Sequence, residues 1–103
     1  MGVNLRFNPL ATTDLQEIKA YIAEENPTAA INTVRHIIAK IEELIDFPEM
    51  GSLLAAKIQR KSNYRYLVYE QYLIFYIYED GFVSVQRILH ARRDYISLLM
   101  DED

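Results

Sequence analysis

The sequence of 103 residues contains no cysteine. Disulfides, thiolate metal ligands and cysteine nucleophiles are therefore excluded together, and the chain fits a reducing cytosol. Imidazole ligands are also scarce, since His36 and His90 are the two histidines, and the carboxylates show none of the spacings typical of zinc, calcium or two-metal sites. We therefore expect neither a metal nor any other cofactor.

The sequence also lacks a long hydrophobic run. No window approaches the roughly 20 apolar residues of a membrane span, and the N-terminal stretch MGVNLRFNP has no apolar segment long enough for a signal peptide. We expect a soluble cytoplasmic protein that has no membrane partner.

Positive charge is in short supply, with 11 Lys and Arg against 15 Asp and Glu and a net charge of -4. Broad binding to nucleic acid is disfavoured, because counterion release requires clustered basic residues. Against this trend, His90, Arg92 and Arg93 follow one another closely at the end of an apolar, β-branched run that begins at Phe82. This basic segment is where we expect function.

A chain of this length predicts one domain, residues 1–103, with a single modest core. Apolar and polar residues alternate from Val3 to Phe7, which predicts a short strand that Asn8-Pro9 ends. Thr13 to Gln16 is a candidate capping box for a first helix that ends near Glu25.

A second helix is predicted directly after the first. Asn26-Pro27 is typical of a helix start, because Asn is a strong N-cap and Pro is tolerated at the first helical position. An apolar stripe at helical spacing then runs from Ala30 to Ile45. The short connection between the two helices indicates an antiparallel helical hairpin.

The second half of the chain predicts strands. We expect Ser52 to Asn63 to be a loop with at most a brief extended piece, and a short helix to start near Asp94. Between them lie three aromatic and β-branched runs whose short connections predict an antiparallel meander: Tyr64 to Tyr69, Tyr72 to Tyr78 and Phe82 to His90. The expected fold is α+β, a small sandwich with the helical hairpin on one face of a four-stranded sheet.

The last predicted strand carries two functional candidates. Regular alternation would place four of its side chains on one face, namely Val83, Val85, Arg87 and Leu89. Ile88 and His90 would then point to the opposite face. A guanidinium and an imidazole are therefore expected on opposite sides of the strand.

Two interpretations remain open for the sheet arginines, Arg65 and Arg87. They lie on neighbouring elements of the predicted sheet and could bind an anion together. Equally, each could be a structural residue paired with a carboxylate such as Glu70 or Asp94.

Similar alternatives apply to the basic segment and to the aromatic residues. His90 is more often structural than catalytic in such a position, and Arg92-Arg93 could be either a solvated helix start or a partner contact. Six of the eight tyrosines lie between Tyr64 and Tyr78. Core packing explains them better than stacking on nucleic-acid bases.

Four segments together resemble the RelE/ParE superfamily of bacterial type II toxin–antitoxin toxins: NPLATTDLQEIKAYIAEENPTAA, the P-x-x-G turn of Pro48 to Gly51, YRYLVY and RILHARRDY. The likeness covers nearly the whole chain and is closer to the ParE-like, plasmid-stabilisation branch. It implies a growth-inhibiting toxin that a cognate antitoxin neutralises, that poisons DNA gyrase, and that reaches operator DNA only through the antitoxin.

The resemblance also implies site residues. On the ParE-like interpretation, Arg65 and Arg87 match arginines of the family motif, and together with the basic pair Arg92 and Arg93 they are the expected target-binding residues. Tyr21 and Ile31 are expected to bind the antitoxin for a separate reason, since they are apolar residues at the rim of the predicted hairpin. The alternative is a RelE-like, ribosome-dependent mRNA endoribonuclease. Its candidate catalytic residues are Arg65, Arg87, His90 and Tyr95, with Lys57 and Lys61 as loose matches to the family's lysines.

Charge favours the ParE-like branch over the nuclease branch. The chain is acidic overall and ends in Asp101-Glu102-Asp103, which opposes docking on ribosomal RNA. A third possibility is a non-toxic member that only binds an antitoxin.

Overall fold

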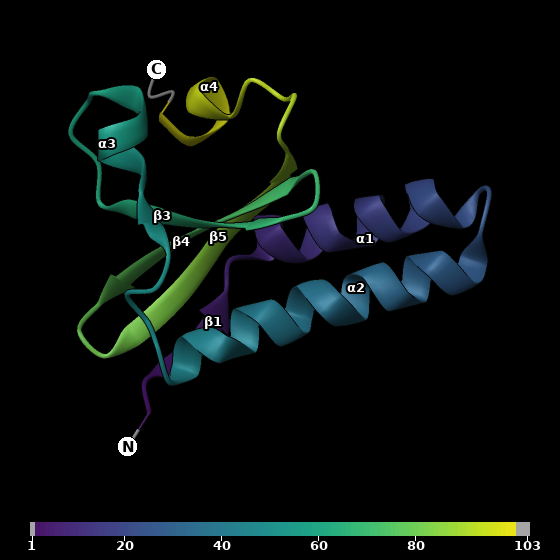
Figure 1. The fold of residues 1–103 in the computed structure, drawn as a ribbon, viewed down its shortest axis with the longest axis horizontal. Helices are drawn as coiled ribbons and strands as arrows, with labels where there is room; N and C mark the ends of the chain where they lie inside the picture. Colours follow the sequence, from purple (N-terminus) through teal and green to yellow (C-terminus); the bar gives the residue numbers. More distant parts are fainter. Residues whose placement is uncertain (1, 101–103) are drawn as a thin grey trace.

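A five-stranded sheet, in the order β1-β5-β4-β3-β2, forms the centre of the protein in a computed structural model that describes residues 2–100 (Figure 1). The acidic stretch 101–103 lies outside the described residues. Strands β3, β4 and β5 form the predicted antiparallel meander, and β1 pairs in parallel with β5. The strand bounds are β1 Asn4–Phe7, β2 Ser52–Leu53, β3 Tyr64–Tyr69, β4 Tyr72–Glu79 and β5 Phe82–His90.

The predicted loop between residues 52 and 63 differs most from expectation. It contains the short strand β2, which extends the expected four-stranded sheet to five, and a five-residue helix, α3, Leu54–Ile58. This helix has weak periodicity because its anchor is one buried side chain, Leu54. The brief extended piece was predicted, whereas the helix was not.

Helix α1, Pro9–Ala23, and helix α2, Pro27–Glu42, form the predicted hairpin, and a 3-10 turn, η1, Glu43–Ile45, continues α2. The capping box expected at Thr13 to Gln16 is wrong, because those residues lie inside α1. The true N-cap is Asn8, whose side-chain oxygen accepts a hydrogen bond from Leu10 N at 2.8 Å.

Helix α2 begins with the same combination of an Asn N-cap followed by Pro. The side chain of Asn26 accepts a hydrogen bond from Ala29 N at 3.0 Å, and Pro27 takes the first helical position, where a missing N–H is harmless. The end of α1, the start of α2 and the loop between them extend past the edge of the sheet (Figure 1).

The helices cover both faces of the sheet. The α1–α2 hairpin packs on one face, and α3 together with α4, Tyr95–Met100, packs on the other (Figure 1). Each face has its own buried cluster. Ile37, Ile41 and Leu44 are completely buried on the hairpin side, and Leu54 and Phe75 are completely buried on the opposite side.

Strand β5 contains a bulge that changes the direction of its later side chains. Phe75 pairs with Arg87 but Tyr76 pairs with Val85, so Gln86 is the extra residue. As a result, Ile88 packs with Val85 in the hairpin-side cluster, whereas Leu89 belongs to the opposite cluster. The predicted regular alternation along this strand is therefore wrong beyond Gln86.

None of the helices within residues 2–100 is long and apolar enough to cross a membrane.

Candidate functional site

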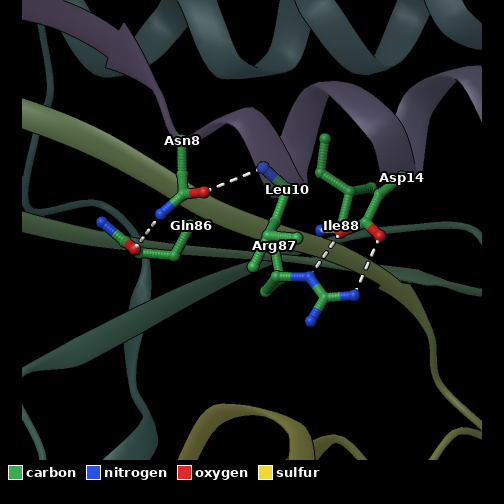
Figure 2. A network of polar contacts seen from close by, with 6 residues as sticks. All are labelled: Asn8, Leu10, Asp14, Gln86, Arg87 and Ile88. Atoms are coloured by element: carbon green, nitrogen blue, oxygen red, sulfur yellow. Dashed lines mark hydrogen bonds and ion pairs between the residues drawn. The ribbon is translucent and has the colours of Figure 1, made fainter.

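The junction between β1 and α1 covers the edge of β5 where the bulge lies. Strand β1 pairs with β5 only as far as Phe7 and Val85, and Asn8 then turns the chain into α1. Asn8 N donates to Val85 O at 2.8 Å, and Asn8 Nδ2 donates to Gln86 Oε1 at 3.2 Å (Figure 2). Beyond this point β5 has no strand neighbour on that side, so the helix must satisfy its edge.

Asp14, from the second turn of α1, satisfies that edge. The residue is buried, with 6% of its surface exposed, and Oδ2 accepts hydrogen bonds from Ile88 N at 2.9 Å and from Arg87 Nε at 2.8 Å. Oδ1 accepts a third from Arg87 Nη2 at 3.0 Å (Figure 2). A bidentate, charge-assisted pair of this kind is strong and directional.

The pairing stabilises the charged form of the Arg87 side chain. The hydrogen bonding that Arg87 donates to Asp14 raises the pKa of the Arg87 guanidinium, and partial burial opposes this rise. The structural partners expected for this arginine, Glu70 or Asp94, are wrong, because the partner is Asp14. The sequence contains a signal for a buried acid at this position, since Asp14 stands at helical spacing between the apolar residues Ala11 and Ile18.

Arg65 on β3 is bound differently. Its Nη1 donates to the main-chain oxygens of Glu49 and Gly51 at 3.1 and 3.0 Å. The two sheet arginines therefore have separate internal partners, one on a helix and one on a loop. The structure does not direct them toward a common ligand.

Tyr76 on β4 binds the same loop from the core. Its hydroxyl donates to Pro48 O at 2.8 Å and accepts from Gly51 N at 3.0 Å, and its ring is completely buried. Burial raises the pKa of the Tyr76 phenol. A Cβ at position 51 would lie 2.5 Å from the Tyr76 hydroxyl, so only glycine fits there.

His90 ends β5 beside a cleft of about 340 Å³ between α1 and the ends of β4 and β5. Its Nδ1 accepts a hydrogen bond from Arg92 N at 3.0 Å, and its ring lies edge-on to Tyr72 at 5.6 Å. Arg93 and Tyr21 also line this cleft.

The remaining basic-segment residues have different surroundings. Arg92 and Arg93 are exposed in the turn between β5 and α4. Asp94 caps α4 by accepting hydrogen bonds from Ser97 N and Ser97 Oγ, so the predicted short helix starts where expected. The Tyr95 ring packs on Phe75 with 5.3 Å between ring centroids and belongs to the core on that side.

The two lysines that loosely match the nuclease branch lie near α3. Lys57 Nζ lies 5.5 Å from the centre of the Tyr66 ring, a cation–π contact, and Lys61 is exposed. Within residues 2–100 no group of three or more His, Asp or Glu side chains is placed to hold a metal ion.

Comparison with known proteins identifies the family. A family model described as "ParE toxin of type II toxin-antitoxin system, parDE" matches residues 5–95. The chain belongs to the ParE toxin family. The predicted RelE/ParE superfamily is thereby confirmed, and the protein is a toxin of a type II toxin–antitoxin system.

Two relatives illustrate the range of the family. A curated protein named "Toxin RelE2", from Caulobacter vibrioides, is 32% identical over 83 residues, which are 81% of this chain and 89% of the relative. A solved structure titled "Chromosomal ParDE TA system from P. aeruginosa" matches with a TM-score of 0.71 at 19% identity, over 85% of this chain and 95% of that one. The second match confirms the predicted fold class.

In this ParE-family toxin the two predicted antitoxin-binding residues lie apart. Tyr21 is 73% exposed on α1, at the cleft that His90 borders. Ile31 is 47% exposed on α2, in a groove that Lys19 and Val34 also line. They therefore open onto two different grooves of the helical hairpin.

Proposed function

We propose that this ParE-family toxin inhibits growth by binding and poisoning DNA gyrase, and that a cognate antitoxin holds it inactive until then. The observation that carries the proposal is the pair that Arg87 forms with the buried Asp14, in which the guanidinium of Arg87 is neutralised by a carboxylate of its own chain.

An mRNA nuclease of this superfamily would need free cations at the scissile phosphate. Charge that builds on phosphoryl oxygens is stabilised by guanidinium and ammonium groups that have no other partner. The Asp14 carboxylate would repel a phosphate brought to Arg87, and Arg65 already donates to two carbonyls. Because both arginines bind groups of their own chain, they support a toxin that acts by binding its target and not by cleaving RNA.

The candidate acid–base residues support the same conclusion. Proton transfer requires a group that reaches the reacting atom with a free proton site. His90 accepts from Arg92 N through Nδ1, so Nε2 is the ring nitrogen left for proton transfer, and the Tyr95 ring is taken up by packing against Phe75. The two residues therefore do not form the acid–base pair that cleavage at a ribose hydroxyl would use.

Arg92 and Arg93 are the residues we assign to target contact. Both are exposed and lie in a turn rather than in a rigid strand, so they can reach outward. Charges at the rim of an interface mainly raise the association rate and make binding sensitive to salt. The matching surface on gyrase would be acidic.

The cognate antitoxin would cover the apolar surface of the hairpin, including the cleft at Tyr21 and the groove at Ile31. A segment that folds onto the toxin can wrap several such grooves at once. Contact with operator DNA would then be made by the antitoxin, because the acidic toxin does not favour it.

Two assays with the purified toxin test the proposal: gyrase supercoiling and mRNA cleavage in a translating extract. We expect gyrase inhibition and intact mRNA. Reversal of both charges, Arg92→Glu with Arg93→Glu, should weaken gyrase inhibition by ten-fold or more, whereas His90→Ala should retain it. Thermal melting of each variant controls for folding.

Codon-specific cleavage of mRNA that His90→Ala abolishes, with folding retained, would contradict the proposal and assign the protein to the nuclease branch. Absence of both activities, with antitoxin binding retained, would make it a non-toxic antitoxin-binding member.

A further inference from the structure

The loop of residues 46–51, between η1 and β2, presents large apolar side chains to solvent. Phe47 is 64% exposed and Met50 is 40% exposed, and together with Pro48 and Tyr78 they border a shallow depression of about 390 Å³. Exposed aromatic and methionine side chains that gather at one place are typical of interaction surfaces.

The backbone of this loop is held from several directions. Phe47 O accepts from Met50 N at 3.1 Å, which closes a turn. The carbonyls of Pro48, Glu49 and Gly51 accept from Tyr76 and Arg65, as described above. A loop anchored in this way presents Phe47 in one position, so a partner does not lose free energy by ordering it.

Negative charge is concentrated in this loop and just before it in the chain. Between Lys40 and Lys57 the sequence contains four acids and no basic residue, and all four acids are exposed: Glu42, Glu43, Asp46 and Glu49. Arg65 comes close in space, but its Nη1 is turned to the loop carbonyls. The loop therefore combines exposed apolar side chains with two exposed acids of its own, Asp46 and Glu49.

We infer that this loop is a docking site for the toxin-binding segment of the cognate antitoxin, and that this segment carries Lys or Arg side chains beside an apolar pocket that receives Phe47. Charge complementarity points to a basic occupant, because the exposed acids in the loop and just before it, and the net charge of -4, are negative. A second copy of the toxin would bring the same acids face to face and is disfavoured.

The gyrase surface is also disfavoured as occupant of this loop, since the contact proposed at Arg92 and Arg93 requires an acidic target. The inference rests on the antitoxin as partner and not on the identity of the target. Its test is therefore independent of whether gyrase is the target.

Titration of the purified toxin with the full-length, co-encoded antitoxin tests the inference. Phe47→Ala should raise the Kd by ten-fold or more and leave the melting temperature of the free toxin unchanged, because an exposed ring contributes little to folding. Val68→Ala is the matched control, since Val68 is 53% exposed on β3, outside both the helical hairpin and the loop. Its Kd should stay within two-fold of the wild type.

A charge variant tests the basic character of the antitoxin segment. Asp46→Asn combined with Glu49→Gln should raise the Kd several-fold at low salt and make it less sensitive to added salt. An unchanged Kd in both the Phe47 and the charge variants would overturn the inference.

Two further outcomes would also overturn it. If Phe47→Ala changes self-association of the free toxin and leaves the antitoxin Kd intact, the occupant is a second copy of the chain. If it abolishes toxicity with an intact Kd, the loop contacts the cellular target.

Discussion

Arg87 and Arg65 lie on two strands of one sheet, and both guanidinium groups bind inside the molecule, but their partners differ in charge. Arg87 binds a carboxylate whose side chain is 7% exposed and which belongs to α1. Arg65 binds two main-chain carbonyls of a surface loop. The first contact cancels a charge and joins a helix to the sheet, whereas the second positions a loop and leaves the charge in place.

This difference predicts different losses of stability when each arginine is replaced. Without Arg87, a buried carboxylate loses its counter-ion and keeps only the hydrogen bond from Ile88 N. Without Arg65, two neutral carbonyls near the surface can turn to water. We therefore expect Arg87 to contribute mainly to the stability of the whole fold. Arg65 should contribute mainly to holding one loop in place.

The largest expected effect is that of Arg87→Ala. We expect the free energy of unfolding to fall by about 3–5 kcal/mol, since an unpaired buried carboxylate remains. Urea denaturation measures this loss. The double variant Asp14→Ala with Arg87→Ala should be less destabilised than the sum of the two single variants, because the unpaired charge is gone.

A loss below about 1 kcal/mol in Arg87→Ala would mean that the pair contributes little, and the comparison with Arg65 would fail. Loss of toxicity in a variant of unchanged stability would return Arg87 to the target-binding residues that the family resemblance implies.

Tyr76→Phe should have an intermediate effect. The variant loses the hydroxyl that bridges Pro48 O and Gly51 N, and we expect a loss of about 1–3 kcal/mol at pH 7 because buried polar groups are left unpaired. Phenylalanine keeps the packing of the ring, so the loss reports the two hydrogen bonds.

The same residue contributes to the alkaline stability of the protein. Burial raises the pKa of Tyr76 above its ordinary value of 10.0, and burial raises the pKa of Tyr64 and Tyr72 as well. The folded state therefore holds these protons more tightly than the unfolded state. The resulting stabilisation is complete below the unfolded pKa and is lost as pH rises through the folded pKa.

Urea denaturation from pH 8 to pH 11 measures this effect. Wild-type stability should fall at the alkaline end, and Tyr76→Phe should reduce the slope without abolishing it, because the other two phenols still titrate. A slope that is unchanged in Tyr76→Phe would contradict the assignment to this phenol.

The smallest expected effect is that of Arg65→Ala, a loss of about 1 kcal/mol. The change should be local, so hydrogen exchange at the amides of Met50 and Gly51 should accelerate more than exchange in β4. Arg65→Lys can restore one donor and should recover part of the protection. If Arg65→Ala destabilises the protein as much as Arg87→Ala does, the two contacts are equivalent and the comparison is wrong.

Local sequence signals predicted most of the fold. The hairpin helices follow from their apolar periodicity and from the second Asn-Pro pair, and the meander follows from three aromatic runs with short connections. The first Asn-Pro pair was interpreted only as the end of a strand, so the start of α1 was misplaced. Helix α3 was missed because five residues with one buried anchor carry little periodic signal.

The candidate site could be predicted only in part. The sequence by itself determined where along the chain each residue type is concentrated. This includes the arginines of the sheet and the pair Arg92 and Arg93. It also carried the segments that identify the RelE/ParE superfamily. These properties depend on neighbours in sequence, which helical and strand periodicities report directly.

Only the tertiary structure decided which partners these residues have. Arg87 and Asp14 are 73 residues apart, and they meet because β1 stops pairing with β5 at Val85, where α1 starts beside β5, and the bulge at Gln86 redirects the residues that follow. Arg65 reaches a loop 14 to 16 residues before it in the chain. Such pairs form because assembly of the sheet leaves particular donors and buried acceptors without partners, and that need arises only once distant segments are packed together.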